Sequence, residues 1–174
     1  MRILSLDLAT RTGWAFTPGQ RNLSEDPVAR AAIESGYFDA RLERGESGGM
    51  RFIRFRAWLA EIFIKTRPEL VTYEMPIVRG WAATAFLIGL ASRVEEEAAV
   101  RKMEYSKINL STLKKWGAGN GHASKEEMIE AAGRIAGHPF EDDNESDAFI
   151  QLCYAINHFD PSGADLRKGG GRTP

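Results

Sequence analysis

Two short apolar runs, separated by a polar turn, begin the chain. The first, RILSLDL at residues 2–8, alternates as a strand that buries Ile3, Leu4 and Leu6. The second, TGWAFT at residues 12–17, follows after a turn that contains Gly13. Apolar runs that are joined by so short a loop predict a β-hairpin.

The middle of the chain alternates between strand and helix patterns. After a polar, proline-broken loop at 18–30, residues 31–40 (AAIESGYFDA) alternate as a third strand. Residues 51–65 place apolar side chains at helical spacing, and residues 69–74 (ELVTYE) form the next strand. A long helix, apolar at its start, is predicted for residues 81–101.

The last third of the chain is predicted to be mainly helical. Its elements are a strand at 104–109, a short helix from Ser111 to Trp116, a glycine loop at 117–121, a helix from Ser124 to Ile135 and a helix from Asp143 to His158. The sequence SKEE at 124–127 has the form of a capping box. This order predicts a mixed α/β fold, in which the helix at 51–65 connects two parallel strands. We expect one domain at residues 1–160 and a disordered tail at 161–174.

The composition narrows the classes of function only slightly. The formal net charge is −1, so an argument for a nucleic-acid partner depends on local clusters of charge. The single cysteine, Cys153, cannot form an internal disulfide, which suits a reducing cytoplasm. We find no signal-peptide layout and no membrane-spanning apolar run, and we expect a cytoplasmic protein without a membrane partner.

Carboxylates end two of the predicted strands and begin the last helix. If the strands of Asp7 and Glu74 are parallel neighbours, both side chains emerge at one edge of the sheet, where open α/β sheets bind ligands. Asp147 lies at the boundary of the last helix's apolar face, with Asn144 and Asp143 one turn earlier. Taken singly, these residues also suit a turn cap, a solvated strand end and favourable interaction with the helix dipole.

Gathered in one place, such carboxylates would repel one another unless a cation neutralised them. Hard divalent cations with oxygen ligands, such as Mg²⁺, do so while keeping waters and substrate phosphates. Two such ions can clamp the attacking water and the leaving oxygen of a phosphodiester. The pattern therefore predicts that Asp7 is a metal ligand.

Four stretches together resemble the RuvC-type Holliday-junction resolvases of the RNase H-like superfamily, in their bacterial or bacteriophage form. They are ILSLDLATRTGWAF at 3–16, LVTYEMP at 70–76, KKWGAGNGHASKEEM at 114–128 and DNESDAF at 143–149. The resemblance implies a five-stranded mixed sheet, three antiparallel strands and then two parallel ones, flanked by helices. It also implies a homodimer that resolves four-way DNA junctions by hydrolysis with Mg²⁺ or Mn²⁺, two ions per active site.

The resemblance assigns the catalytic residues to matching positions of this chain. They are Asp7, Glu74, Asn144 and Asp147, all of them also metal ligands. Asn144 stands where the family carries aspartate or histidine, so Asp143 is a further candidate for the fourth ligand. Leu8 and Ala9 replace the proline-glycine pair that is usual in the bacterial enzymes, a change that removes no ligand.

Local positive charge supplies the candidate DNA contacts. We expect binding by Lys114, Lys115, Lys125, Arg79, Arg51 and Arg54. Lys114 and Lys125 match the family and bracket the glycine loop, whereas the arginines at 51–56 equally suit a solvated helix face. The resemblance also places dimer packing and an aromatic junction probe after Glu74, for which Trp81, Phe86 and Met75 are candidates beside a plain core role. His122, His138 and His158 are expected to be surface or helix-end residues, not ligands.

Other functions remain open at this point. An actin-like or sugar-kinase ATPase also leads its first strand to an aspartate, but that fold needs two domains, more than 174 residues can hold. A ribonuclease H and a looser branch or flap nuclease share the expected fold. A junction-binding protein without catalysis is the alternative that Asn144 suggests.

Overall fold

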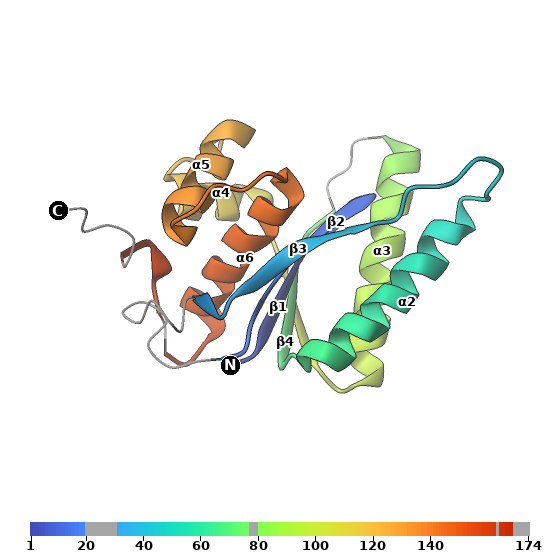
Figure 1. Ribbon diagram of the computed structural model, residues 1–174, viewed down its shortest axis with the longest axis horizontal. Coiled ribbons are helices and arrows are strands. Elements are labelled where there is room, and N and C mark those ends of the chain that lie inside the picture. Colours follow the sequence, from blue (N-terminus) through green and yellow to red (C-terminus); the bar gives the residue numbers. More distant parts are fainter. Residues whose placement is uncertain (20–30, 77–79, 163, 169–174) are drawn as a thin grey trace.

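The computed structural model describes residues 1–19, 31–76, 80–162 and 164–168, in which one sheet lies between two groups of helices (Figure 1). The sheet has five strands in the order β3-β2-β1-β4-β5. They are β1 (Ile3–Asp7), β2 (Arg11–Thr17), β3 (Glu34–Asp39), β4 (Leu70–Glu74) and β5 (Glu104–Ile108). Strands β1 to β3 are antiparallel neighbours, whereas β1–β4 and β4–β5 are parallel. The predicted mixed sheet is confirmed.

The helices follow the predicted order with small changes at their ends. They are α2 (Gly49–Thr66), α3 (Trp81–Val100), α4 (Leu110–Ala118), α5 (Lys125–Ala136) and α6 (Asp143–Phe159), followed by a 3₁₀ turn, η1 (Leu166–Lys168). Among the described residues, no helix has the length and apolar character that a membrane crossing requires. Figure 1 shows α4, α5 and α6 on one side of the sheet and α2 and α3 on the other.

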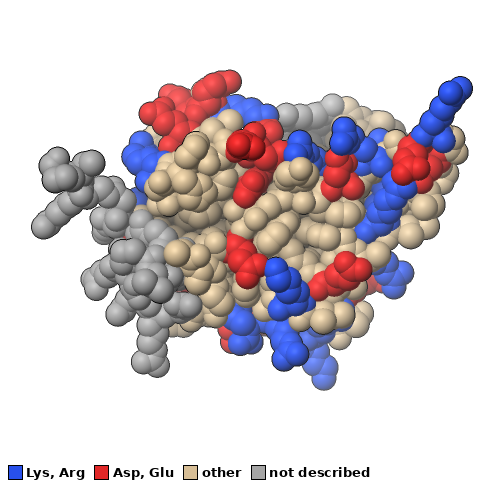
Figure 2. Space-filling view, viewed as in Figure 1, with Lys and Arg blue, Asp and Glu red and all other residues tan. Residues whose placement is uncertain are grey.

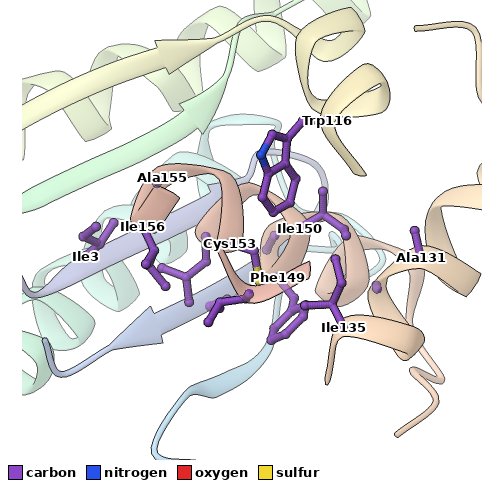
Figure 3. Packing of buried hydrophobic residues seen from close by; sticks show 14 of the residues in the cluster. Ile3, Trp116, Ala131, Ile135, Phe149, Ile150, Cys153, Ala155 and Ile156 are labelled. Atoms are coloured by element: carbon purple, nitrogen blue, oxygen red, sulfur yellow. The ribbon is translucent and has the colours of Figure 1, made fainter. Parts of the chain in front are cut away.

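Each face of the sheet has its own apolar core. Ile3 of β1 belongs to the cluster under α4, α5 and α6, where Phe149 and Ile156 of α6 pack (Figure 3). Leu4 and Leu6 point to the opposite face and belong to the cluster under α2 and α3. Because successive strand residues alternate in direction, β1 is buried on both faces. On the α6 face, the same alternation leaves Ser5 and Asp7 in line with Ile3.

Two predicted boundaries in the C-terminal third are wrong. Helix α4 is capped by Asn109, whose side chain accepts a hydrogen bond from the Ser111 backbone N–H, so Ser111 lies inside the helix. The helix also continues through Gly117, where a Cβ atom would lie 3.2 Å from Ile150, and ends at Gly119 with a φ of 80°. The predicted glycine loop is therefore shorter, because Gly117 serves close helix packing rather than a turn.

The segment assigned to a tail is packed in its first part. Ala164 and Leu166 are buried and join the core under α6. The Arg167 guanidinium lies 4.5 Å from the Trp116 ring centroid and pairs with Asp165. Two buried apolar side chains therefore anchor this short turn, whereas the sequence predicted disorder from residue 161. Residues 20–30 of the predicted first loop, and 169–174, lie outside the described part.

Candidate active site

Asp7 and Glu74 end neighbouring parallel strands at the same edge of the sheet. The register pairs Leu6 with Tyr73, so the residues that follow them, Asp7 and Glu74, lie side by side. Both line a pocket of about 400 Å³, together with Asp143, Asn144 and Asp147 from the first two turns of α6. The structure thus brings all five predicted metal ligands to one pocket.

The start of α6 is held to the hairpin by polar contacts. Asp142 caps the helix by accepting a hydrogen bond from the Glu145 backbone N–H at 3.0 Å. The other carboxylate oxygen of Asp142 lies 3.0 Å from the Arg11 guanidinium of β2. Ser35 of β3 donates a hydrogen bond to the Glu145 carboxylate at 2.6 Å. These contacts bind the carboxylate-bearing turn of α6 to strands β2 and β3.

Gly13 allows α6 to approach the sheet closely. It is the residue of β2 that pairs with Asp7. A Cβ atom at this position would lie 1.8 Å from the Asn144 carbonyl oxygen, so only glycine leaves room for the α6 backbone. The glycine thereby seats the start of α6 beside Asp7, which the sequence signalled only as a turn residue.

Burial and mutual repulsion raise the pKa values of Asp7 and Asp147. Burial raises the pKa of Asp7 well above its ordinary value, and the charges of Asp147, Glu74 and Asp143 raise it further. Burial, and then the charge of Asp143, raises the pKa of Asp147 to about 6. Buried carboxylates that disfavour one another's charge call for a counter-cation, and perturbed acidities of this kind cluster at functional sites.

Lys125 and Lys114 supply positive charge at the pocket. Lys125, at the start of α5, forms an ion pair with Asp143, and this hydrogen bond holds the pKa of Asp143 below its ordinary value. Lys114 of α4 lines the pocket and donates a hydrogen bond to the Ala123 carbonyl oxygen at 2.6 Å. Both predicted lysines therefore border the carboxylates, and both side chains lower the pKa of Asp147.

The donor set suits a hard divalent cation in its chemistry. The five candidate ligands offer oxygen atoms from β1, β4 and α6. Within the described residues, however, no three or more His, Cys, Asp and Glu side chains already form a group that could hold a metal ion. Mg²⁺ is commonly held by one or two carboxylates plus waters and substrate phosphates, so such a group is not required for this ion.

Of the remaining predicted DNA contacts, those that the structure describes do not line the pocket. Lys115 is exposed on α4, and Arg79 lies outside the described residues. Arg54 forms an ion pair with Glu46 and donates to the Arg41 carbonyl oxygen at 2.8 Å, so its charge is satisfied within the chain. On the face in Figure 2, basic and acidic side chains are interspersed rather than gathered into one large patch.

Arg51 and the candidate junction probes divide between packing and exposure. The Arg51 guanidinium lies 5.2 Å from the Phe86 ring centroid, and Phe86 itself packs on Phe52. Met75 lines the pocket and is 46% exposed, and Trp81 at the start of α3 is 89% exposed. Phe86 therefore has a packing role, while Met75 and Trp81 remain available to a partner. His122, His138 and His158 are exposed, as expected.

Comparisons with known proteins agree with this architecture. No family model matches the sequence, and no curated protein matches it. Thermus thermophilus RuvC in complex with a Holliday junction substrate matches with a TM-score of 0.70 at 18% identity, over 98% of this chain and 93% of that chain. The chain has the RuvC fold. A structure of T. thermophilus RuvC matches with a TM-score of 0.64 at 21% identity, over 86% of this chain and 90% of that chain. The yeast mitochondrial Holliday junction resolvase Ydc2 matches with a TM-score of 0.56 at 13% identity, over 97% of this chain and 76% of that chain.

Some residues that build the site were not recognised from the sequence. The start of α6 is held in place by contacts of Arg11, Ser35 and Glu145. The spacing of residues along the chain cannot predict such contacts, because the strands and the helix lie about a hundred residues apart. The same is true of Gln151, which is buried on α6 and hydrogen-bonded to both central strands. A glutamine inside the apolar run AFIQLCYAI was the one available signal.

Proposed function

We propose that this chain is a metal-dependent endodeoxyribonuclease that resolves four-way DNA junctions. The convergence of Asp7, Glu74 and Asp147 on one pocket, in a chain with the RuvC fold, carries this proposal. A solved structure of that fold contains a Holliday junction substrate, which supports branched DNA as the ligand.

Asp7, Glu74 and Asp147 are the residues that would hold Mg²⁺ or Mn²⁺, two ions per site, with Asn144 or Asp143 as the fourth ligand. Bound divalent ions supply a polarised water and neutralise charge on the leaving oxygen in phosphodiester hydrolysis. The carboxylates that would hold these ions come from three elements of the fold, β1, β4 and α6. Met75, Leu87 and Leu110 form apolar parts of the pocket wall beside the carboxylates.

Lys114 and Lys125 have the placement of phosphate contacts. Both border the carboxylates, and an ammonium group can bind a phosphate oxygen as a point charge. Lys125 would exchange its ion pair with Asp143 for the DNA backbone, which frees Asp143 to face the metal site. Lys115, at the exposed surface of α4, extends the same positive region.

A homodimer is the assembly that fits two opposed cuts in one junction. Helix α3 carries the exposed side chains Trp81 and Ile88 on a face that its own fold does not cover. An isologous interface on this helix would relate two active sites by a two-fold axis.

Cleavage of matched substrates tests the proposal. The wild-type chain should nick four-way junctions in Mg²⁺ and should cut a flap, a duplex and an RNA/DNA hybrid much more slowly. Asp7→Asn should abolish cutting and leave junction binding intact or tighter, because it removes a metal ligand and a negative charge. Preferred cleavage of the hybrid would indicate a ribonuclease H, and binding without any cleavage would indicate a junction-binding protein.

A further inference from the structure

A layer of buried polar side chains lies directly beneath the carboxylates. Its members share an element and a face with one carboxylate each: Ser5 with Asp7 on β1, Thr72 with Glu74 on β4, and Gln151 with Asp147 on α6. The pairs are two residues apart on the strands and four apart on the helix, which are the spacings that keep side chains on one face. The polar layer therefore repeats the arrangement of the site one step deeper.

The layer is closed by hydrogen bonds between the three elements. The Gln151 side-chain amide donates to the Thr72 hydroxyl at 3.1 Å and to the Leu6 carbonyl oxygen at 3.3 Å. The Ser5 and Thr72 hydroxyls are 2.7 Å apart. Leu6 provides the carbonyl group of the peptide bond that leads into Asp7. Helix α6 is thus tied to both strands directly below their carboxylates.

The surroundings make this polarity unusual. Ser5 and Thr72 are 0% exposed and Gln151 is 1% exposed. The next side chains on the same face, Ile3 and Leu70, belong to the apolar core. Burying an amide lowers the free energy of unfolding unless the amide is hydrogen-bonded, so an apolar residue would be the simpler choice for stability at this position. Directional hydrogen bonds allow one position of α6 on the sheet, whereas apolar packing tolerates small shifts.

We propose that Gln151, acting with Thr72, is a positioning residue that sets the distance of Asp147 from Asp7 and Glu74. Through that distance it determines how tightly the site binds divalent cations. The inference rests on the proposed metal-dependent nuclease. The hydrogen-bonded layer would hold the carboxylates at a fixed separation, which the mutually repelling carboxylates cannot do alone. Groups that orient metal ligands commonly change metal affinity or activity by about 10- to 100-fold when they are removed.

The test uses the full chain and a series of matched variants. Gln151→Met keeps the length of the side chain without its amide, and Thr72→Val keeps the shape of threonine without its hydroxyl. Thr72→Ser retains the hydroxyl and serves as the conservative partner of Thr72→Val. Ile156→Val shortens a buried apolar side chain of α6 outside the polar layer and controls for lost packing. The readouts are Mn²⁺ affinity by electron paramagnetic resonance, junction binding in EDTA, thermal unfolding, and cleavage against Mg²⁺ concentration.

We expect Gln151→Met and Thr72→Val to weaken Mn²⁺ binding and to raise the Mg²⁺ requirement by about 10-fold or more, with junction binding in EDTA unchanged. Thr72→Ser should bind Mn²⁺ more tightly than Thr72→Val. Ile156→Val should lower the unfolding temperature without altering Mn²⁺ affinity. If Gln151→Met does not fold, the comparison of the two Thr72 variants decides the question.

Wild-type Mn²⁺ affinity in both Gln151→Met and Thr72→Val would overturn the positioning role while leaving the nuclease intact. Equal loss of affinity in Ile156→Val would also overturn it, because packing alone would then explain the effect. If the wild-type chain binds Mn²⁺ and cuts no DNA, the proposed function fails. The Mn²⁺ affinities of the Gln151 and Thr72 variants then still test the positioning role. A wild-type chain that binds no Mn²⁺ would refute both.

Discussion

The charge of Asp147 makes the stability of the chain depend on pH. Its pKa is about 6 in the folded chain, against 3.8 for the ordinary side chain. Between these values the folded state binds more protons than the unfolded state, so the free energy of unfolding falls as the pH rises through this window. A shift of this size corresponds to about 3 kcal/mol, which partial solvent exposure reduces to about 1–3 kcal/mol.

Asp147→Asn should therefore raise the free energy of unfolding by about 1–3 kcal/mol at pH 7 in EDTA and change it little at pH 4. Urea unfolding at both pH values measures the difference. Asp39→Asn is the control of opposite sign, because hydrogen bonds from Arg41 hold the pKa of Asp39 below its ordinary value. If Asp147→Asn equals the wild type at pH 7, the carboxylate is not destabilised by its surroundings.

The identity of the fourth ligand is a second question at the scale of residues. Asn144 and Asp143 both line the pocket, but the Asp143 carboxylate is held by Lys125. Asn144 brings an oxygen without charge, so Asn144→Asp should keep or raise cleavage at low Mg²⁺. Asp143→Asn should raise the Mg²⁺ requirement several-fold. Cleavage rates across a Mg²⁺ titration check both, and a fully active Asn144→Ala beside an inactive Asp143→Ala would assign the ligand to Asp143.

At the scale of elements, the contact of α6 with β2 is the most sensitive point of the site. Gly13→Ala would place a Cβ atom 1.8 Å from the Asn144 carbonyl oxygen, and backbone cannot yield as a side chain does. We expect a loss of about 1–3 kcal/mol or more in the free energy of unfolding, and loss of Mg²⁺-dependent cleavage beyond what instability explains. Chemical denaturation and cleavage assays measure the two effects.

Gly48→Ala is the matched control for this change. Gly48 has a φ of −56°, and a Cβ atom at this position would meet no atom of the described residues within 4 Å, so alanine fits there without strain. Because Gly48 is the N-cap residue of α2, where alanine is less favourable than glycine, the variant should lose at most about 1 kcal/mol of stability and should cleave normally. Wild-type stability and cleavage in Gly13→Ala would show that α6 can move away from β2 without harm to the site.

The elements themselves were largely predictable from the sequence, and their contacts were not. The alternation in β1 and the capping box at Ser124 located their elements because both signals are local. The end of α4 was misplaced because Gly117 resembles a loop residue, and only the tertiary contact with Ile150 explains it. The close approach of Gly13 to the α6 backbone could not be predicted, because Gly13 and Asn144 lie far apart in the sequence.

Charged residues show the same difference between what local sequence signals predict and what tertiary contacts decide. The carboxylates at the ends of β1 and β4 could be predicted, because parallel neighbouring strands bring such residues to one edge. The arginines at 51–56 resembled a DNA-binding cluster, yet the structure pairs Arg54 with Glu46 and places Arg51 against an aromatic ring. A formal charge in the sequence does not reveal the partner that satisfies it within the fold.

At the scale of the whole molecule, the exposed start of α3 predicts how two chains associate. Trp81, Ala85, Ile88 and Ser92 follow the spacing of one helical face, and all of them are exposed. Trp81 and Ile88 are 89% and 52% exposed, which is costly for large apolar side chains unless a partner covers them. We expect a homodimer at micromolar concentration, with this face of α3 against its copy.

Ile88→Glu should raise the dimer dissociation constant by at least about 10-fold, because the interface would bury a charge and would repeat it across the two-fold axis. Sedimentation of the wild type and the variant measures the shift, with and without a four-way junction. Ile64→Glu is the matched control, since Ile64 is 64% exposed on α2, and it should leave the dimer intact. A monomer in the variant should nick single strands of the junction instead of making paired cuts, because only one site then acts at a time. A wild-type chain that sediments as a monomer even on the junction would contradict this assembly.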